Sequence, residues 1–418
     1  MSDLSYTGKE KFIVFFACAL GWAHDAIGLT LINFLALPIA SEFGVTLDYI
    51  GFIMSAQYIA TVPGAFIFGY LADRFGRKNF LLVSVIWDAL LTAVSAYAPN
   101  ILVFAILRVI SGMGVSWGIA FALLGEVYSP KHRAMFGGWV HATFILGYVG
   151  SGLSALLLES PLQSMLGPIT WWRPLFLIAL FPIPFVIILY FILPESKLWQ
   201  KYSELEAAES IPLKAQLGNI LRSGYLKLLL LCTFLFWAAE FAYHATVDWG
   251  PTFLQTAPMP FTSGQADLIV MLIAIVLIFV FPTVGFLGDK IGRRKAFMLP
   301  ASLGMIGVSV FGFFTVLSFD STFALAGLFI MAMGFSSHGL FGVWSSELFP
   351  TSSRAAANSV IFSVARGVSL GAWVVSLLAV YLGFSLAQAM LISAIGFVLM
   401  FLLPWTLPET KGKVLEPV

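Results

Sequence analysis

Apolar stretches of roughly 20 residues follow one another along almost the whole chain, and short polar connections separate them. A helix needs about 20 mainly apolar residues to cross the hydrocarbon core of a bilayer. The pattern therefore predicts an all-α integral membrane protein with twelve transmembrane helices. Their expected positions are residues 11–36, 47–71, 79–98, 101–125, 135–158, 173–193, 226–254, 265–288, 296–317, 322–345, 355–380 and 386–406.

The composition agrees with a chain that lives in a lipid bilayer. Of the 418 residues, 60% are hydrophobic and only 10% are charged, whereas a soluble globular protein carries about 25% charged residues. The formal net charge is +1, so nothing in the charge balance indicates a nucleic-acid partner.

The basic residues are distributed unevenly between the connections. Of the 22 Lys and Arg residues, all but Arg108, Arg173 and Arg366 lie near the termini or in the even-numbered connections. Cytoplasmic loops of membrane proteins carry an excess of Lys and Arg. We therefore expect a multi-pass protein of the plasma membrane with both termini in the cytoplasm. The polar first ten residues predict no cleavable signal peptide before the first helix.

Three polar motifs occur twice at a nearly constant offset. The motif at residues 69–78 recurs at 285–294, the motif at 126–133 recurs at 347–354, and Pro-Glu-Ser-Lys at 194–197 recurs as Pro-Glu-Thr-Lys at 408–411. Such repetition indicates duplication of a structural unit. We expect a six-helix bundle at 1–194, a cytoplasmic linker at 195–225 and a second six-helix bundle at 226–418.

The repeated motif Gly-x-x-x-Asp-x-x-Gly-Arg, followed by Lys or Arg, resembles the loop signature of the major facilitator superfamily. The resemblance implies two pseudo-symmetric bundles, a substrate site between them near the membrane midplane, and alternating access by rocking of the bundles. We expect a monomeric functional unit that needs no cofactor.

We interpret the repeated motifs as parts of a conformational latch. Glycine permits tight turns and close helix contacts, and the acidic residues can pair with Arg or cap a helix. The alternative is that these charges only set the membrane topology. The expected gating residues are Gly69, Asp73, Gly76, Arg77, Glu126 and Arg133 in the first half, and Gly285, Asp289, Gly292, Arg293, Glu347 and Arg354 in the second.

Asp25, Asp88, Arg108, Glu240 and Arg366 are ionisable and are expected near the bilayer centre, whereas His244 and Asp248 lie nearer the outer half of the seventh helix. A charge at the bilayer centre costs about 2.5–3.5 kcal/mol on insertion scales and is a functional candidate. A pair of Asp25 with Arg108 resembles the arrangement in proton-coupled sugar porters, which implies that both, with Glu240, take part in proton coupling. The alternative is a static ion pair. Asp88 is expected to serve packing.

Arg366 lies in the middle of the eleventh predicted helix, and the fifth helix has no matching cation. Its planar guanidinium is suited to a carboxylate, and organic anion transporters of the superfamily likewise have an Arg in this helix. We therefore expect Arg366 to bind the substrate, with a structural pair to Glu240 as the alternative. Further candidates for the substrate site are His24, His141, Tyr148, Tyr243, His244, His338 and Gln57, each of which could also be packing.

The seventh predicted helix carries His244-x-x-x-Asp248-x-x-Pro-Thr-x-Leu. This string resembles the sialate and lactate/pyruvate proton symporter family, whereas the glutamines of sugar porters are replaced by Ala238 and Ala239. The resemblance implies a proton symporter of a small organic acid anion such as lactate or pyruvate. A sugar or polyol symporter and a non-transporting membrane sensor are the alternatives. No Walker loop, metal-ligand cluster or Ser/His/Asp elbow is found in the sequence, so no enzyme is expected.

Overall fold

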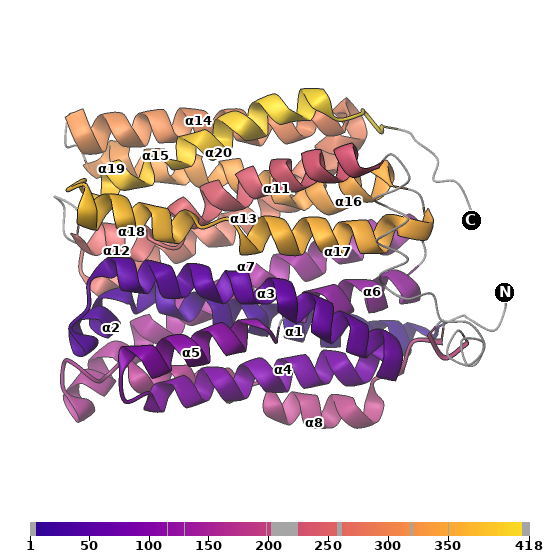
Figure 1. Cartoon of the computed structure of the whole chain (residues 1–418), viewed down its shortest axis with the longest axis horizontal. Coiled ribbons are helices and arrows are strands. Elements are labelled where there is room, and N and C mark those ends of the chain that lie inside the picture. The colour runs from indigo at the N-terminus through magenta and orange to yellow at the C-terminus, as the bar shows by residue number, and fades with distance from the viewer. Residues whose placement is uncertain are drawn as a thin grey trace.

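The computed structural model describes residues 6–114, 116–128, 130–197, 199–201, 225–256, 261–317, 321–349 and 351–411. This part of the chain is built of helices and connections and contains no strand (Figure 1). Twelve helical segments in it are long and apolar enough to cross a membrane, which confirms the predicted number.

The first six membrane spans, here called the N-terminal half, occupy the lower part of Figure 1 in indigo to magenta. Their helices are α1 (Gly8–Phe34), α2 (Ala36–Phe43), α3 (Leu47–Phe75), α4 (Arg77–Val94), α5 (Ile101–Gly112), α6 (Trp117–Val127), α7 (Pro130–Leu166) and α8 (Ile183–Ile192). A 3₁₀ segment, Arg173–Leu180, opens the sixth span before α8.

The last six spans, here called the C-terminal half, fill the upper part of the same view in orange to yellow. Their helices are α11 (Leu226–Thr246), α12 (Gly250–Thr256), α13 (Ser263–Ile291), α14 (Arg293–Gly312), α15 (Ser321–Gly334), α16 (His338–Leu348), α17 (Thr351–Gly367), α18 (Gly371–Tyr381), α19 (Leu386–Met390) and α20 (Ser393–Leu402). Most of the predicted linker 195–225 lies outside the described residues.

Large apolar side chains cover the outer surface of the bundle. Phe191 is 78% exposed, Phe279 is 68% exposed and Leu102 is 66% exposed. Exposure of such an apolar surface to water would be unfavourable, whereas lipid chains solvate it. The pattern is that of a protein whose helices face hydrocarbon.

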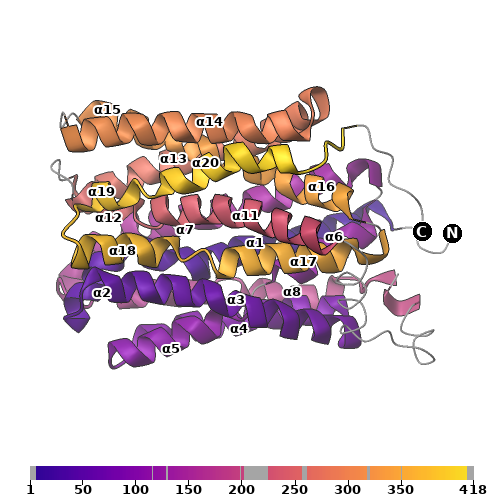
Figure 2. The same cartoon turned by 45° about the horizontal axis from the view of Figure 1, so that its top comes forward.

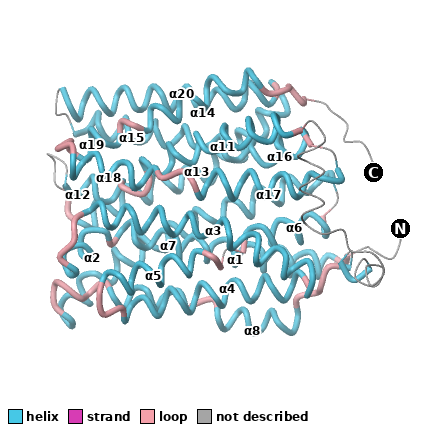
Figure 3. The backbone as a smooth tube through the Cα atoms, viewed as in Figure 1, coloured by secondary structure: helices cyan, strands magenta, loops and turns pink. Residues whose placement is uncertain are grey.

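Several spans that the sequence predicts as continuous helices are interrupted in the structure. The fourth span breaks between α5 and α6, the seventh between α11 and α12, and the eleventh between α17 and α18 (Figure 3). Leu370, in the last of these breaks, has φ 52°, a conformation that costs a non-glycine residue energy. Irregular backbone at membrane depth is tolerated where protein or a cavity surrounds it, and hydropathy does not report such breaks.

The two halves contact each other mainly along α3 and α7 of the N-terminal half. α3 packs against α17 and α18, and α7 packs against α13, as the rotated view in Figure 2 also shows. Small residues permit this close approach. A Cβ added at Gly367 would lie 2.2 Å from Val62 Cγ2, and one added at Gly51 would lie 2.2 Å from Ser376 Oγ.

We name the two ends of the bundle by their charge. The basic end holds the connections around Arg77 and Arg293, and the opposite end holds α2 and the connection after Tyr381. Twelve crossings return the chain to the side on which it began, so α1 begins and the described chain ends at the basic end (Figure 1).

Candidate functional site

A cavity lies between the two halves at the middle of the bundle, with about 970 Å³ of atom-free space including its opening. The N-terminal half contributes side chains from α1 and α7, and the C-terminal half contributes side chains from α11, α13, α15, α16 and α17. Its wall is mostly apolar and aromatic. The polar and charged lining residues are His141, Tyr148, Glu240, Tyr243, Thr246, His338 and Arg366.

Arg366 is the cation of this cavity, and it is surrounded by aromatic rings. Its Cζ lies 5.2 Å from the ring centroid of Tyr58, 5.2 Å from that of Phe144 and 5.7 Å from that of Trp22. The side chain is buried, and its Nε has no hydrogen-bond partner. Among the described residues no ion pair joins Arg366 to a carboxylate, so the expected alternative of a pair with Glu240 is not formed.

The face of an aromatic ring attracts a cation, by about 0.5–2 kcal/mol. The three rings therefore hold the guanidinium in place without cancelling its charge. Tyr58, Trp22 and Phe144 come from α3, α1 and α7, so residues of the N-terminal half position a cation that belongs to the C-terminal half. The sequence analysis named none of the three for this role, because each was one aromatic residue among many.

Glu240 is the carboxylate of the cavity, and two histidines flank it. Its Oε2 lies 3.2 Å from His244 Nε2 and its Oε1 lies 3.5 Å from His338 Nε2. His244 Nδ1 lies 2.8 Å from Asp248 Oδ2. Glu240, His244 and Asp248 thus form a line along one face of the seventh span, because residues four apart in a helix are neighbours. Asp248 also accepts a hydrogen bond of 2.9 Å from Asn33 of α1.

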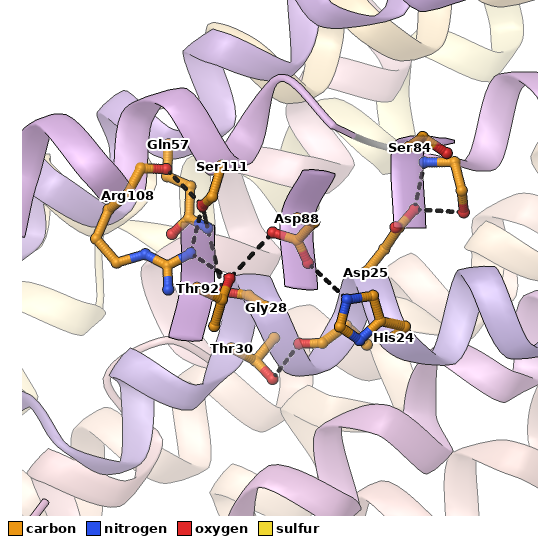
Figure 4. A network of polar contacts seen from close by, with 12 residues as sticks. His24, Asp25, Gly28, Thr30, Gln57, Ser84, Asp88, Thr92, Arg108 and Ser111 are labelled. Atoms are coloured by element: carbon orange, nitrogen blue, oxygen red, sulfur yellow. Dashed lines mark hydrogen bonds and ion pairs between the residues drawn. The ribbon is translucent and has the colours of Figure 1, made fainter. Parts of the chain in front are cut away.

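A second buried polar network lies inside the N-terminal half (Figure 4). Asp25 Oδ2 accepts hydrogen bonds from the backbone N–H and the hydroxyl of Ser116, at 2.8 and 2.9 Å. Asp88 lies between His24 and Thr92, with His24 Nε2 at 3.3 Å from its Oδ2 and the Thr92 hydroxyl donating to its Oδ1 at 3.1 Å. Arg108 donates to the same Thr92 hydroxyl at 2.9 Å.

This geometry corrects the expected pair of Asp25 with Arg108. Asp25 is held by Ser116 in the break of the fourth span, and Arg108 reaches Asp88 through Thr92. The physical reason is that the break after Gly112 turns the start of α6, with its free backbone N–H groups, toward Asp25. Asp88, expected to serve packing, belongs to the buried charge network instead.

Two residues expected at the substrate site lie away from the cavity. His24 is buried against Asp88. Gln57 donates from Nε2 to the carbonyl of Gly28 at 3.1 Å and to the Ser111 hydroxyl at 3.4 Å. A third, His244, lies one layer behind Glu240. His141, Tyr148, Tyr243 and His338 line the cavity as expected of substrate-site candidates.

Ion pairs at the basic end repeat in the two halves. Arg77 Nη2 lies 3.2 Å from Glu126 Oε1, and Arg293 Nη2 lies 2.8 Å from Glu347 Oε1. Arg293 also pairs with Asp289 at 2.5 Å. The expected networks at these residues are therefore present as contacts. The side chains of Asp73, Arg133 and Arg354 lie outside the described part of the structure.

One further glutamate completes each network, a role that was not expected for either residue from the sequence. Glu195 accepts hydrogen bonds from the backbone N–H of Lys78, the closer at 3.0 Å, and Glu409 accepts from those of Arg293 and Arg294 at 2.8 and 3.1 Å. Each thus caps the N-terminus of a helix, α4 or α14. The signal was present, since both belong to the repeated Pro-Glu-(Ser/Thr)-Lys motif.

The four predicted gating glycines divide into two kinds. Gly76 and Gly292 have φ of 110° and 96°, so they make the turns that the glutamates cap, and a side chain would meet Glu195 or Glu409 there. Gly69 and Gly285 lie within α3 and α13. A Cβ at Gly69 would meet nothing within 4 Å and one at Gly285 only the Gly339 carbonyl at 4.0 Å, so a close approach at these two was wrongly expected.

Partial burial by itself raises the pKa of Glu409, but the backbone N–H groups of Arg293, Arg294, Lys411 and Thr410 outweigh it and hold this pKa below its ordinary value. The carboxylate form is therefore favoured at the helix terminus. This cap is a fixed negative charge at neutral pH.

Toward the opposite end, hydrogen bonds join the two halves directly. Tyr381 donates to Asp48 at 3.1 Å, and Ser263 donates to Glu159 at 2.5 Å. The backbone N–H of Trp373 donates to the Ser55 hydroxyl at 3.1 Å. These contacts hold the halves together on the side of the cavity away from the basic end.

Comparison with known proteins identifies the family. The Major Facilitator Superfamily matches residues 12–372, so the chain belongs to it. A probable 4-methylmuconolactone transporter of Cupriavidus pinatubonensis is 27% identical over 97% of this chain and 92% of its own length. A cis,cis-muconate transport protein of Acinetobacter baylyi is 25% identical over 87% of this chain and 85% of its own.

Among solved structures, the xylose transporter XylE from E. coli in a partially occluded inward-open conformation matches with a TM-score of 0.77. The match covers 98% of this chain and all of that chain, at 19% identity. At this identity the likeness shows the fold of two six-helix bundles and does not extend to the substrate.

Proposed function

We propose that this member of the major facilitator superfamily is a proton-coupled symporter that carries a small organic acid anion by alternating access. The observation that carries the proposal is Arg366. It is a buried cation in the wall of the central cavity, ringed by aromatic side chains and without a carboxylate partner among the described residues.

Among the described residues no carboxylate lies within ion-pair distance of Arg366, so its guanidinium can pair directly with a bound anion. Arg presents a planar fork of N–H donors that matches the two oxygens of a carboxylate. An anion that enters the cavity therefore meets one site at which its charge is balanced. A neutral sugar has no comparable use for an unpaired guanidinium.

The wall around Arg366 indicates the body of the substrate. Phe144, Phe281, Phe335 and Phe362 present flat apolar surfaces to the cavity. A planar unsaturated acid can stack on such rings, whereas lactate or pyruvate would leave most of the wall uncovered. Two relatives are named for muconate and for a methylmuconolactone, which agrees with a conjugated organic acid.

Proton symport follows from the same electrostatics. A carrier that must reorient through a low-dielectric interior does so most easily when the anion's charge is neutralised. Glu240 in the cavity wall is one place where a proton can bind, and the network of Asp25, Asp88 and Arg108 is another. The positive-inside rule places the basic end in the cytoplasm, so the contacts of the opposite end close the outer face.

The test is uptake into proteoliposomes with an alkaline interior. We expect labelled cis,cis-muconate to accumulate, and excess unlabelled muconate to compete more strongly than lactate, pyruvate or xylose. Arg366→Gln should reduce uptake at least tenfold, because the buried anion loses its counter-charge. Lys227→Gln removes an exposed cation at the start of α11 and is the matched control, expected to transport normally.

Two outcomes contradict the proposal. Competition by xylose with no effect of any organic acid would assign the cavity to sugars. Uptake by Arg366→Gln that equals the wild-type rate would remove the anion site from this residue.

A further inference from the structure

The seventh span carries a line of titratable residues that begins at the cavity and ends at a contact between the halves. Glu240 lines the cavity, His244 lies behind it, and Asp248 bonds to Asn33 of the other half. All three side chains are buried; Asp248 is fully inaccessible and His244 is 1% exposed. We call Glu240, His244 and Asp248 the acidic triad.

The geometry of His244 requires an extra proton in this triad. Its Nδ1 lies 2.8 Å from a carboxylate oxygen of Asp248, and its Nε2 lies 3.2 Å from one of Glu240, the latter as an ion pair rather than a well-aligned hydrogen bond. A neutral imidazole protonates only one of its nitrogens. The other nitrogen would then direct its lone pair at a carboxylate oxygen, unless a second proton lies between them.

A count of charges leads to the same requirement. Glu240 and Asp248 supply two negative charges, and Arg366 supplies one positive charge nearby, since the Tyr58 ring contacts both Arg366 and His244. With neutral histidines the buried group carries one net negative charge, and one added proton makes it neutral. Low-dielectric surroundings strongly favour the neutral total.

Other groups face the triad from every side. His338 of α16 approaches Glu240. Tyr243 packs edge-on against His244, and Tyr58 of α3 also contacts the His244 ring. His141 of α7 lies across the cavity. Of these, Tyr58 and His141 belong to the N-terminal half.

The triad therefore contacts the N-terminal half at two points. The Tyr58 ring lies with its centroid 4.0 Å from that of His244, and a protonated imidazole is attracted to an aromatic face. Asn33 Nδ2 donates to Asp248, whose other oxygen faces His244. Rocking of the halves separates both contacts, so the charge state of the triad and the closure of the opposite end are linked.

We propose that the acidic triad is the proton-binding site that controls closure of the opposite end, its protonated form holding the halves together through Tyr58 and Asn33. This rests on the proposed proton symport and names its site. The proposal assigns the coupling proton to the C-terminal half. Of the three triad residues, only Glu240 lines the cavity.

The test measures closure without any substrate. Spin labels at Tyr97→Cys and Phe384→Cys, exposed positions near the opposite end of the two halves, report the distance between them. The buried Cys18 and Cys232 are replaced by Ala in this background. The protein in lipid nanodiscs is titrated between about pH 5 and pH 9. We expect the short-distance population to rise at least threefold as the pH falls.

The variants assign the transition to the triad. Glu240→Gln combined with Asp248→Asn should abolish the pH dependence, and the milder His244→Gln should reduce it in a protein that keeps the triad's carboxylates. Glu10→Gln, which removes a carboxylate at the basic end, should titrate as the parent does. A parent protein without any pH-dependent distance change overturns the inference.

A pH-dependent distance change of full amplitude in both triad variants also overturns the inference. So does a distance change that disappears in Asp88→Asn but persists in the variant that combines Glu240→Gln with Asp248→Asn. Failure of the proposed function would be seen in the uptake experiment and not in the distance measurement. A protein that closes with pH but accumulates no organic acid keeps this inference and loses the earlier one. A protein that accumulates muconate but shows no triad-dependent closure does the reverse.

Discussion

The ring of Tyr58, from the third helix, lies 4.0 Å from the imidazole of His244 in the seventh span, centroid to centroid. The same ring covers the guanidinium of Arg366 at 5.2 Å. A single side chain of the N-terminal half thus contacts both the cation of the cavity and the histidine of the acidic triad. Its movement with the N-terminal half changes the surroundings of both.

This position predicts how Tyr58 responds to substitution. Tyr58→Leu removes both ring contacts, each worth about 0.5–2 kcal/mol, and we expect the KM for cis,cis-muconate to rise roughly tenfold in proteoliposome uptake. Tyr58→Phe keeps the ring, and the hydroxyl it deletes has no hydrogen-bond partner. The Tyr58→Phe variant should therefore take up muconate with nearly the wild-type KM. Equal loss in both variants would contradict a role for the ring face.

The network around Asp88 predicts a non-additive pair of substitutions. Arg108→Gln removes the cation that reaches Asp88 through Thr92, and leaving a buried charge uncompensated costs about 3–5 kcal/mol. Asp88→Asn lowers the negative charge by one and keeps a side chain able to bond Thr92. We expect the double variant to recover at least half of the melting temperature that Arg108→Gln loses in detergent. Simple addition of the two losses would show that the residues act independently.

Anion binding should be accompanied by proton uptake. The cavity holds Arg366 and Glu240, and a bound carboxylate adds one negative charge to a buried group that one proton had made neutral. Both carboxylates of muconate are ionised near pH 7, so we expect at least about one proton to be taken up per muconate bound, measured with a pH indicator in weakly buffered solution. Glu240→Gln should reduce this uptake by more than half. Muconate binding without any pH change would contradict the prediction that anion binding is coupled to proton uptake.

The helix cap at Glu409 predicts a pH-dependent stability. Backbone N–H groups lower its pKa in the folded protein, so the stabilisation is fully present above the unfolded pKa of about 4.5 and is lost as the pH falls through the lower folded value. Glu409→Gln should reduce stability at pH 7 by about 1 kcal/mol, as for loss of a helix cap.

Thermal melting of wild type and Glu409→Gln checks this, and their difference should shrink as the pH drops below about 4.5. Glu195→Gln, the equivalent change in the first half, should likewise reduce stability at pH 7, because Glu195 accepts the backbone N–H of Lys78 at the start of α4. A difference that grows toward acid pH would reverse the predicted sign.

The sequence by itself determined the membrane class, the number of spans, the duplication and the family. These depend on sums over local stretches, because transfer of a 20-residue segment into lipid is governed by its own hydropathy. It also identified buried charges such as Glu240 and Arg366, since an ionisable residue inside an apolar run is visible without any structure. The paired motifs at Arg77 and Arg293 were recognised for the same reason.

Only the tertiary structure decided which charges meet. Asp25 accepts a hydrogen bond from Ser116, and Arg108 reaches Asp88 through Thr92. This differs from the expected pair because the fourth span breaks at a place that hydropathy does not mark. The contacts of Tyr58 with His244 and Arg366 join residues that are 186 and 308 positions apart in the sequence. Such contacts depend on the rotation and approach of whole helices, which packing between distant segments sets and no local pattern records.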